Sequence, residues 1–137
     1  MIVFNYETDF KLDNESKISK WISLCIEKYN YTEGELNYIF CDDGYLHKLN
    51  VEFLNHDTLT DIISFDYTLG KLISGDIYIS IERVQENAKK YSQTFDNELN
   101  RVIIHGVLHY CGFKDKSEDD KSKMRAEEND CLALLNT

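Results

Sequence analysis

Apolar residues recur at two different spacings along the chain, and these spacings predict where helices and strands lie. Between residues 18 and 29 they return every three or four positions, which indicates one face of a helix capped by Asp13 or Asn14. Residues 35–41 instead alternate between the two sides of a strand, and residues 1–5 form an apolar start that suits another strand. The helical positions are Ile18, Trp21, Ile22, Cys25, Ile26 and Tyr29.

The middle of the chain predicts a short helix, two strands and another helix. Asp43 is expected to cap a helix that runs to about Leu54. β-Branched and aromatic residues then cluster in residues 62–65 and 76–81, around two glycines, which is typical of a pair of strands. Residues 82–91 follow with a helical pattern.

Two further helices are predicted toward the C-terminus. The first is expected to begin at the cap Asp96, to carry apolar residues on one face and to end at Gly112. The second is expected to open with a capping box formed by Ser117 and Asp120 and to run to about Leu135. Together the elements predict an α+β fold in which a small mixed sheet packs with about five helices.

Length and composition indicate one packed domain. The chain has 137 residues, of which 42% are hydrophobic and 17 are aromatic (9 Tyr, 7 Phe, 1 Trp), so disorder is excluded and residues 1–137 are expected to form a single domain. The absence of a long apolar run and of a secretory signal predicts a soluble, cytoplasmic protein with no membrane partner. Four widely separated cysteines predict reduced, packed thiols: Cys25, Cys41, Cys111 and Cys131.

The charge is strongly acidic but unevenly distributed. The chain has 15 Lys and Arg against 25 Asp and Glu, a net charge of −10, which excludes a surface that binds phosphates everywhere. Residues 36–80 contain seven acidic and two basic residues, whereas residues 101–125 contain six basic and four acidic residues. Any nucleic-acid binding is therefore expected on one face, and the acidic remainder is suited to repel nonspecific RNA or to meet a basic protein.

A cluster of metal-ligand residue types stands between residues 105 and 115. His105 and His109 are four residues apart, so on a helix both imidazoles reach one cation from the same face. Gly112 can end the helix and let the chain turn back, which brings Asp115 to the same point. A histidine pair alone is more often a surface or packing feature, but the third candidate ligand favours a three-ligand metal site with an open position, as in catalytic zinc sites.

The other two histidines have no such partners. His47 is interpreted as a residue on the surface of a helix, and His56, in a polar loop, is left open as a residue that lines the site.

The spacing also resembles the HExxHxxGxxH motif of zinc metalloproteases. It predicts a zincin-like metal site on a helix and the turn that follows it. Gly106, however, stands where those proteases carry the glutamate that takes the proton from water. The protease alternative is therefore disfavoured, and a different hydrolytic substrate is expected.

Three blocks of the sequence resemble the YbeY family, which comprises bacterial rRNA maturation factors and single-strand-specific metallo-endoribonucleases. The first block spans residues 49–57 with Thr60-Asp61-Ile62-Ile63-Ser64-Phe65, the second is residues 75–80, and the third is residues 105–115. The resemblance implies a YbeY-like metal-dependent hydrolase, that is, a nuclease with endonuclease activity and a role in ribosome biogenesis.

The resemblance also implies which residues bind metal and where this chain departs from the family. Two of its zinc-ligand histidines correspond to His105 and His109, and the family's usual third histidine corresponds to Asp115, which implies one Zn²⁺ per chain. An aspartate adds negative charge, so a bound water is expected to be a weaker acid than in a three-histidine site. Leu54 stands where the family commonly has an arginine implicated in activity, and Leu59 replaces a proline.

The missing arginine leaves open which cation stabilises charge on a scissile phosphate. The candidates are Lys114, Lys116 and Arg101, with ordinary solvated surface as the alternative for each. Thr60, Asp61 and Asp76 are as consistent with tying strand ends as with lining the site. The catalytic proton acceptor and the oligomeric state stay open.

Two functions remain at this point. The first, implied by the resemblance, is a zinc-dependent endoribonuclease for maturation of the 3′ end of small-subunit rRNA and for ribosome quality control. Its partners would be single-stranded rRNA segments and the ribosome or ribosomal proteins. The alternative is a non-catalytic ribosome-assembly factor in which the metal only supports the fold, a reading that the acidity of the chain favours.

Overall fold

Four strands form one mixed sheet in the order β1-β2-β4-β3 in the computed structural model, which describes residues 1–56 and 58–136. The neighbours β1 and β2 are parallel, as are β2 and β4, whereas β3 runs antiparallel to β4 at the edge of the sheet. The strands are β1 (Ile2–Tyr6), β2 (Thr32–Cys41), β3 (Ile62–Asp66) and β4 (Leu72–Ser80). All four of these strands lie where the sequence predicts them, although β2 and β4 begin earlier.

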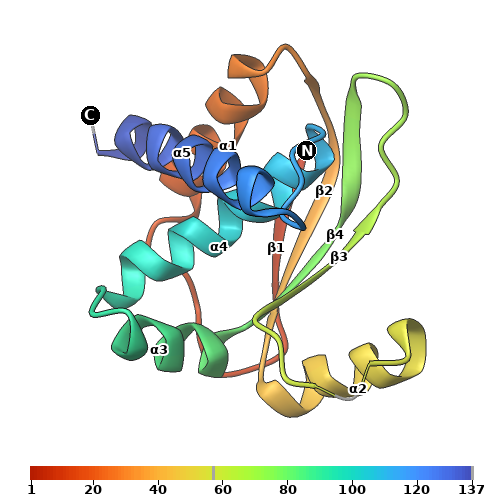
Figure 1. Cartoon of the computed structure of the whole chain (residues 1–137), viewed down its shortest axis with the longest axis vertical. Coiled ribbons are helices and arrows are strands. Elements are labelled where there is room, and N and C mark those ends of the chain that lie inside the picture. The colour runs from red at the N-terminus through yellow and green to blue at the C-terminus, as the bar shows by residue number, and fades with distance from the viewer. Residues whose placement is uncertain (57, 137) are drawn as a thin grey trace.

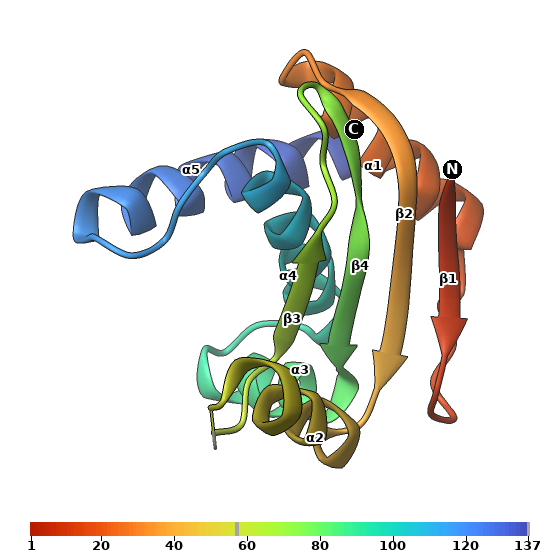
Figure 2. The same ribbon diagram turned by 90° about the vertical axis from the view of Figure 1, so that its right-hand side faces the viewer.

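Helices α1, α3, α4 and α5 cover one face of this sheet, whereas α2 lies on the other side near one end of the strands (Figures 1 and 2). The bounds are α1 (Glu15–Lys28), α2 (Asp43–Leu54), α3 (Ile81–Lys90), α4 (Phe95–Tyr110) and α5 (Glu118–Leu135). The predicted α+β fold of a small mixed sheet with about five helices is thus confirmed. No helix among the described residues has the length and apolar character needed to cross a membrane.

The alternation of residues along β2 and β4 divides the core between the two faces of the sheet. Leu36, Tyr38 and Phe40 of β2 are fully buried against the helices, together with Ile77 and Ile79 of β4. The smaller cluster on the α2 side consists of Cys41, Leu46 and Ile63, with Leu49, Phe65 and Tyr78 packed around it. The period of two in these strands places alternate side chains in alternate layers.

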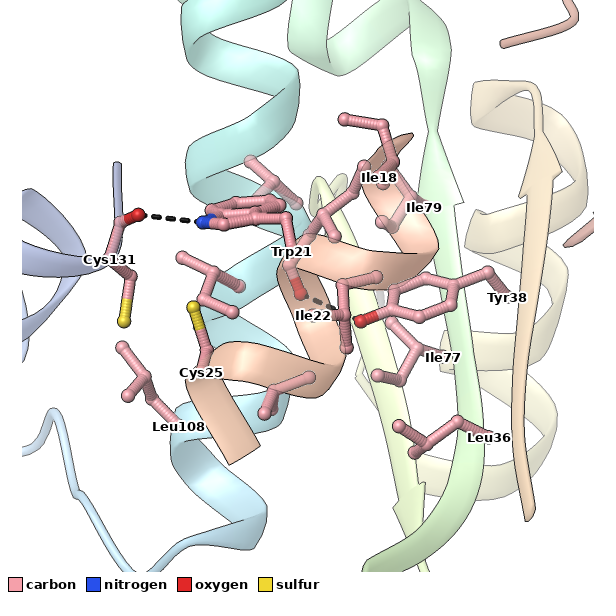
Figure 3. Close-up of a cluster of buried hydrophobic side chains, with 14 of the residues drawn as sticks. Ile18, Trp21, Ile22, Cys25, Leu36, Tyr38, Ile77, Ile79, Leu108 and Cys131 are labelled. Atoms are coloured by element: carbon pink, nitrogen blue, oxygen red, sulfur yellow. Dashed lines mark hydrogen bonds between the residues drawn. The ribbon is translucent and has the colours of Figure 1, made fainter. Parts of the chain in front are cut away.

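Helix α1 contributes the apolar face that the sequence predicts, and it packs against both the sheet and α5 (Figure 3). The indole Nε1 of Trp21 donates a hydrogen bond of 2.6 Å to the carbonyl oxygen of Cys131 in α5. The Tyr38 hydroxyl donates one of 3.0 Å to the carbonyl oxygen of Ile103 in α4. All four cysteines are free and buried, as predicted.

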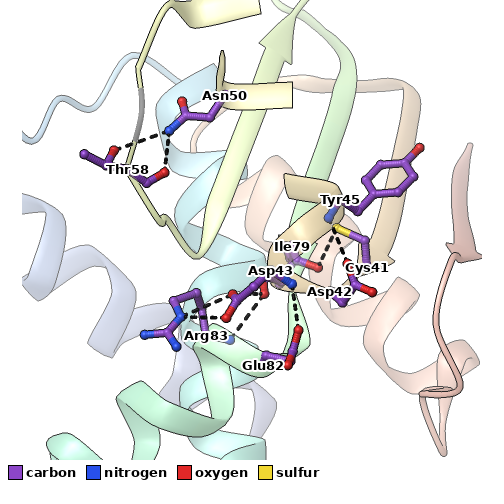
Figure 4. Close-up of polar contacts among 10 residues, drawn as sticks. Cys41, Asp42, Asp43, Tyr45, Asn50, Thr58, Ile79, Glu82 and Arg83 are labelled. Atoms are coloured by element: carbon purple, nitrogen blue, oxygen red, sulfur yellow. Dashed lines mark hydrogen bonds and ion pairs between the residues drawn. The ribbon is translucent and has the colours of Figure 1, made fainter. Parts of the chain in front are cut away.

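The cap of α2 is Asp42, so the predicted cap Asp43 was wrong by one residue. An Asp42 oxygen accepts a hydrogen bond of 2.8 Å from the Tyr45 amide (Figure 4). Asp43 instead reaches the start of α3, where it accepts hydrogen bonds from the Ser80 hydroxyl at 2.7 Å and from the Arg83 guanidinium at 3.2 Å. Two adjacent aspartates compete for the same cap, and this tertiary contact decides between them.

The cap of α4 is also displaced from its predicted position. The Thr94 hydroxyl accepts the capping hydrogen bond from the Asn97 amide at 3.1 Å, so the prediction of Asp96 was wrong and the helix begins at Phe95. At the other end α4 stops at Tyr110, and Gly112 has the left-handed φ of +96° that the predicted turn requires.

The remaining predicted caps lie at the expected positions. Asn14 occupies the N-cap of α1, but its side chain makes no capping hydrogen bond. Ser117 and Asp120 form the predicted capping box at the start of α5, because each side chain binds the other residue's backbone amide. A capping box depends only on residues within one turn, which is why sequence predicts it well.

Tyr110, the last residue of α4, ties that helix to two strands. Its hydroxyl lies 3.0 Å from the Phe65 carbonyl oxygen and 3.2 Å from that of Asp76. A Cβ at Gly75 would lie 2.5 Å from this hydroxyl, so only glycine allows the close approach. We expect Tyr110→Phe to lower the free energy of unfolding by about 1–2 kcal/mol, measured by urea titration, because buried carbonyls lose their donor.

The matched control for this variant is Tyr67→Phe, since Tyr67 is an exposed tyrosine directly after β3. An equal loss of stability in both variants would show that the Tyr110 hydroxyl contributes nothing specific.

Candidate metal centre

The last two turns of α4 and the loop after it bring three candidate ligand atoms together. His105 and His109 lie one turn apart, with their Nε2 atoms 3.0 Å from each other. The turn at Gly112 reverses the chain, and Asp115 Oδ2 lies 3.3 Å from His105 Nε2 and 3.4 Å from His109 Nε2. The three residues form a cluster able to hold a metal ion, as the sequence predicts.

The size of this triangle fits a tetrahedral divalent ion. Bonds of 2.0–2.1 Å from a tetrahedral centre place the ligand atoms about 3.3 Å apart. The observed separations of 3.0, 3.3 and 3.4 Å lie around that value. Lone pairs this close repel one another unless a cation or a proton lies between them, so the donor set and its geometry suit a bound metal.

Glu128 of α5 orients the first of these histidines. His105 Nδ1 lies 2.7 Å from Glu128 Oε2, and a proton on Nδ1 that donates to this carboxylate leaves the Nε2 lone pair free for a metal. The other oxygen, Glu128 Oε1, accepts a hydrogen bond of 3.0 Å from Arg101. Glu128 is buried with an exposed fraction of 5%, so this carboxylate is held in place behind the imidazole, as the outer partners of metal-binding histidines are.

Sequence reasoning missed Glu128, although the sequence holds a signal for it. Glu128 falls on the stripe of α5 that is otherwise apolar and buried, between Met124 and Cys131. A charged residue at a buried helical position needs a charged partner, which points to a role beyond surface solvation.

Charges in this cluster shift the pKa values of His105 and Glu128 in opposite directions. Burial alone lowers the pKa of His105, but the hydrogen bond to Glu128 and the charges of Glu128, Asp115 and Asp61 outweigh it and raise the pKa. Burial would raise the pKa of Glu128, yet its bonds to His105 and Arg101 lower it. Glu128 is therefore held as a carboxylate.

A cavity of about 480 Å³ opens beside the three ligand residues. Its walls come from β3, α3, α4, α5 and the loop at Asp115. The lining residues are Thr60, Asp61, Ile62, Ser64, Asn87, Tyr91, Glu98, Arg101, Val102, His105, His109, Asp115, Arg125 and Glu128. A concave site with convergent polar side chains, shifted pKa values and a candidate metal cluster is the place to look for an active site.

Two of the three residues left between a structural and a site role lie in this cavity. Thr60 and Asp61 line it, and burial raises the pKa of Asp61, although the charge of His105 opposes this shift. Asp76 is not among the described lining residues, and its carboxylate accepts a hydrogen bond of 3.0 Å from Asn37 on the neighbouring strand. Its role in the described structure is to tie β2 to β4.

The cations considered as substitutes for the family's arginine also differ in whether they line the cavity. Lys114 and Lys116 are absent from the described lining of the cavity, whereas Arg101 lines it. Arg125, which the sequence reasoning did not single out, lines it as well. Leu54, at the family's arginine position, is exposed near the end of α2 and contributes nothing to this lining.

The other two histidines lie away from the cavity. His47 is half-buried on α2, and His56 is exposed in the loop after α2, so the possibility that His56 lines the site is not supported by the described lining. Asp57, which ends the first part of the first sequence block, lies outside the described residues.

Gly106 packs against isoleucine side chains of β3 and β4 and is not among the described residues that line the cavity. A Cβ at this position would lie 2.9 Å from Ile77 Cδ1 and 3.3 Å from Ile62 Cδ1. A glutamate here would have to displace packed isoleucines, so position 106 offers no place for the general base of the metalloproteases.

Known proteins resemble this chain along most of its length. The family model described as Endoribonuclease YbeY matches residues 3–136 of the chain. The chain belongs to the YbeY family. Endoribonuclease YbeY of Flavobacterium johnsoniae is 60% identical over 135 residues, which cover 98% of this chain and 97% of the relative. Endoribonuclease YbeY of Flavobacterium psychrophilum is 58% identical over 135 residues, which cover 98% of this chain and 96% of the relative.

The fold of the YbeY family is also visible in a distant solved structure. The solution structure of TM1509 from Thermotoga maritima superposes with a TM-score of 0.69, at 22% sequence identity, over 98% of this chain and 89% of its own. Membership of the YbeY family confirms the resemblance inferred from the three sequence blocks. It also confirms the prediction that the chain is an enzyme of the hydrolase class, a nuclease.

Proposed function

We propose that this chain is a zinc-dependent endoribonuclease that cuts single-stranded RNA and acts in maturation of the 3′ end of small-subunit rRNA and in ribosome quality control. Residues 1–137 would form one metal-dependent hydrolase domain that works in the cytoplasm with the ribosome or ribosomal proteins. The observation that carries the proposal is the triangle of His105, His109 and Asp115 at one wall of a polar cavity, in a member of the YbeY family.

One Zn²⁺ per chain suits this donor set best. Two imidazoles and one carboxylate favour zinc over magnesium or calcium, which prefer oxygen ligands alone. When bound, such an ion would lower the pKa of a water molecule and would supply positive charge to the phosphodiester. His105, His109 and Asp115 would hold it, and Glu128 would keep His105 in the tautomer that ligation needs.

A carboxyl group in the same cavity is suited to accept a proton. Asp115 belongs to the ligand cluster, and Glu128 is bound to His105 and Arg101. Asp61 and Glu98 also line the cavity, and burial raises the pKa of both, but only the pKa of Asp61 is also shifted by the charge of His105. We assign Asp61 the role of proton acceptor in the proposed reaction.

Removal of the metal tests the proposal. After treatment with a chelator, we expect the circular dichroism spectrum to stay that of a folded protein, because the core is continuous without the metal ligands. Cleavage of a single-stranded RNA should be lost and should return with stoichiometric Zn²⁺. RNA cleavage that persists in fully stripped protein would contradict zinc dependence.

The same measurement decides on the alternative, a ribosome-assembly factor without catalytic activity. The net charge of −10 favours that alternative, since an acidic surface is suited to basic ribosomal proteins. Unfolding on metal removal, with no cleavage by the loaded protein, would support a structural metal and overturn the proposed enzyme.

A further inference from the structure

The cavity beside the metal ligands is lined by more acidic than basic side chains. Its carboxyl groups belong to Asp61, Glu98, Asp115 and Glu128, and its two cationic side chains are Arg101 and Arg125. A phosphodiester that enters such a site meets negative charge, so a free cation is needed to hold it. The position at which the family commonly carries an arginine does not provide one here, because Leu54 occupies it.

Arg101 is already committed to the protein. Its guanidinium donates to Glu128 Oε1 at 3.0 Å and to Asn129 Oδ1 at 2.9 Å. Its side chain is only 15% exposed. Moving this guanidinium to a ligand would break a buried ion pair, so Arg101 balances the charge of Glu128 and does not bind substrate.

Arg125 lies one turn before Glu128 on α5, and among the described residues its guanidinium makes only a long ion pair with that carboxylate. Its side chain is 63% exposed, and its Nη1 stands 4.0 Å from Glu128 Oε1, beyond hydrogen-bond distance. Within the described residues, no hydrogen bond engages its guanidinium. Glu128 is poorly placed to accept a hydrogen bond from Arg125, because its two carboxylate oxygens already accept hydrogen bonds from Arg101 and His105.

Arg125 lines two neighbouring hollows, and both hollows also contain candidate metal ligands. It lines the main cavity, and it also lines a second hollow of about 250 Å³ that shares His105, Asp115 and Glu128 with the first. Arg125 therefore borders both hollows, as do the candidate ligands His105 and Asp115. A strand of RNA that crosses the metal site from one hollow to the other passes Arg125.

We propose that Arg125 binds the RNA phosphate next to the metal ligands and so supplies the cation that Leu54 does not. This role rests on the proposed endoribonuclease function. A free guanidinium binds two phosphate oxygens through parallel N–H donors, which a lysine does not reproduce. Arg125 is thus a substrate-binding residue on a helix distant in sequence from the position that it replaces.

The test compares Arg125→Gln with Lys123→Gln in zinc-loaded protein. Both residues are exposed on α5 and both changes remove one positive charge, but Lys123 does not line the described part of either hollow. Binding of a short fluorescent single-stranded RNA is followed by anisotropy at several salt concentrations, alongside its rate of cleavage. Melting temperature and zinc content check that each variant is folded and loaded.

We expect Arg125→Gln to weaken RNA binding about ten- to hundredfold, the range for loss of a charge-assisted contact. The slope of log affinity against log salt should become shallower by about 0.7, because one phosphate contact in a single strand is lost. Arg125→Lys should keep the slope of the wild type but recover only part of the affinity. Lys123→Gln should behave as the wild type.

Equal binding and equal salt slopes for Arg125→Gln and Lys123→Gln, in a series whose wild type binds and cuts RNA, would overturn the assignment of Arg125 alone. A wild-type protein that neither binds nor cuts single-stranded RNA would overturn the proposed function and this assignment with it.

Discussion

Replacement of both His105 and His109 by alanine is expected to abolish zinc binding and to lower RNA cleavage at least about a thousandfold. Metal catalysis contributes several kcal/mol to transition-state stabilisation, and each 1.36 kcal/mol corresponds to a factor of ten in rate. The two imidazoles supply two of the three ligand atoms, which lie 3.0 Å apart, so Asp115 alone is left in the double variant. Zinc content per chain and single-turnover cleavage measure the two effects.

The double variant should remain folded, because neither histidine belongs to the buried core. Its control is His56→Ala, which removes an exposed imidazole from the loop after α2, outside the described lining of the cavity. Stoichiometric zinc in the double variant, or cleavage at the rate of the control, would refute the assignment of the two ligands.

The second large effect is expected at Glu128, where one carboxylate serves both the metal centre and the fold. Glu128→Ala removes the acceptor that orients His105, and loss of such an outer partner weakens metal affinity about 10–100-fold. It also leaves Arg101 without its carboxylate in a nearly buried setting, which costs about 3–5 kcal/mol of folding free energy. A zinc competition titration and urea unfolding measure these two losses separately.

Glu128→Gln and Asp130→Ala complete this experiment. Glutamine keeps the shape and one acceptor oxygen, so its effects on zinc affinity and on stability should both fall between those of the wild type and of Glu128→Ala. Asp130 is an exposed acid on the same helix, and its replacement should change neither quantity. If Glu128→Ala lowered stability but left zinc affinity at the wild-type value, Glu128 would be a structural residue only.

The sequence predicts the candidate ligands of the site but not the residues that α5 contributes to it. The ligand set comes from residues 105–115, a stretch in which helix geometry and one glycine turn fix the relative positions. The triangle was therefore predictable from spacing alone. Glu128 and Arg125 come from α5, and their approach to α4 depends on how the two helices pack, which no local spacing encodes.

The same distinction applies to the helix caps. The capping box of Ser117 and Asp120 was predicted correctly because both partners lie within one turn. The cap of α2 was misplaced by one residue because Asp42 and Asp43 are locally equivalent. Only the contact of Asp43 with Ser80 and Arg83, at the start of α3, separates their roles.

The sequence by itself determined the α+β fold, the elements and their approximate bounds, the three candidate ligands and the family. The fold, the elements and the candidate ligands depend on periodicity or spacing over short stretches of chain, where backbone geometry leaves few alternatives, whereas the family follows from the resemblance of three sequence blocks. The tertiary structure decided which side chains surround the candidate ligands: Glu128 behind His105, Asp61 in the cavity, Arg101 hydrogen-bonded to α5, and Arg125 with only a long ion pair to Glu128. Burial and charge pairing arise only when distant elements pack together, and they determine which groups remain available for chemistry.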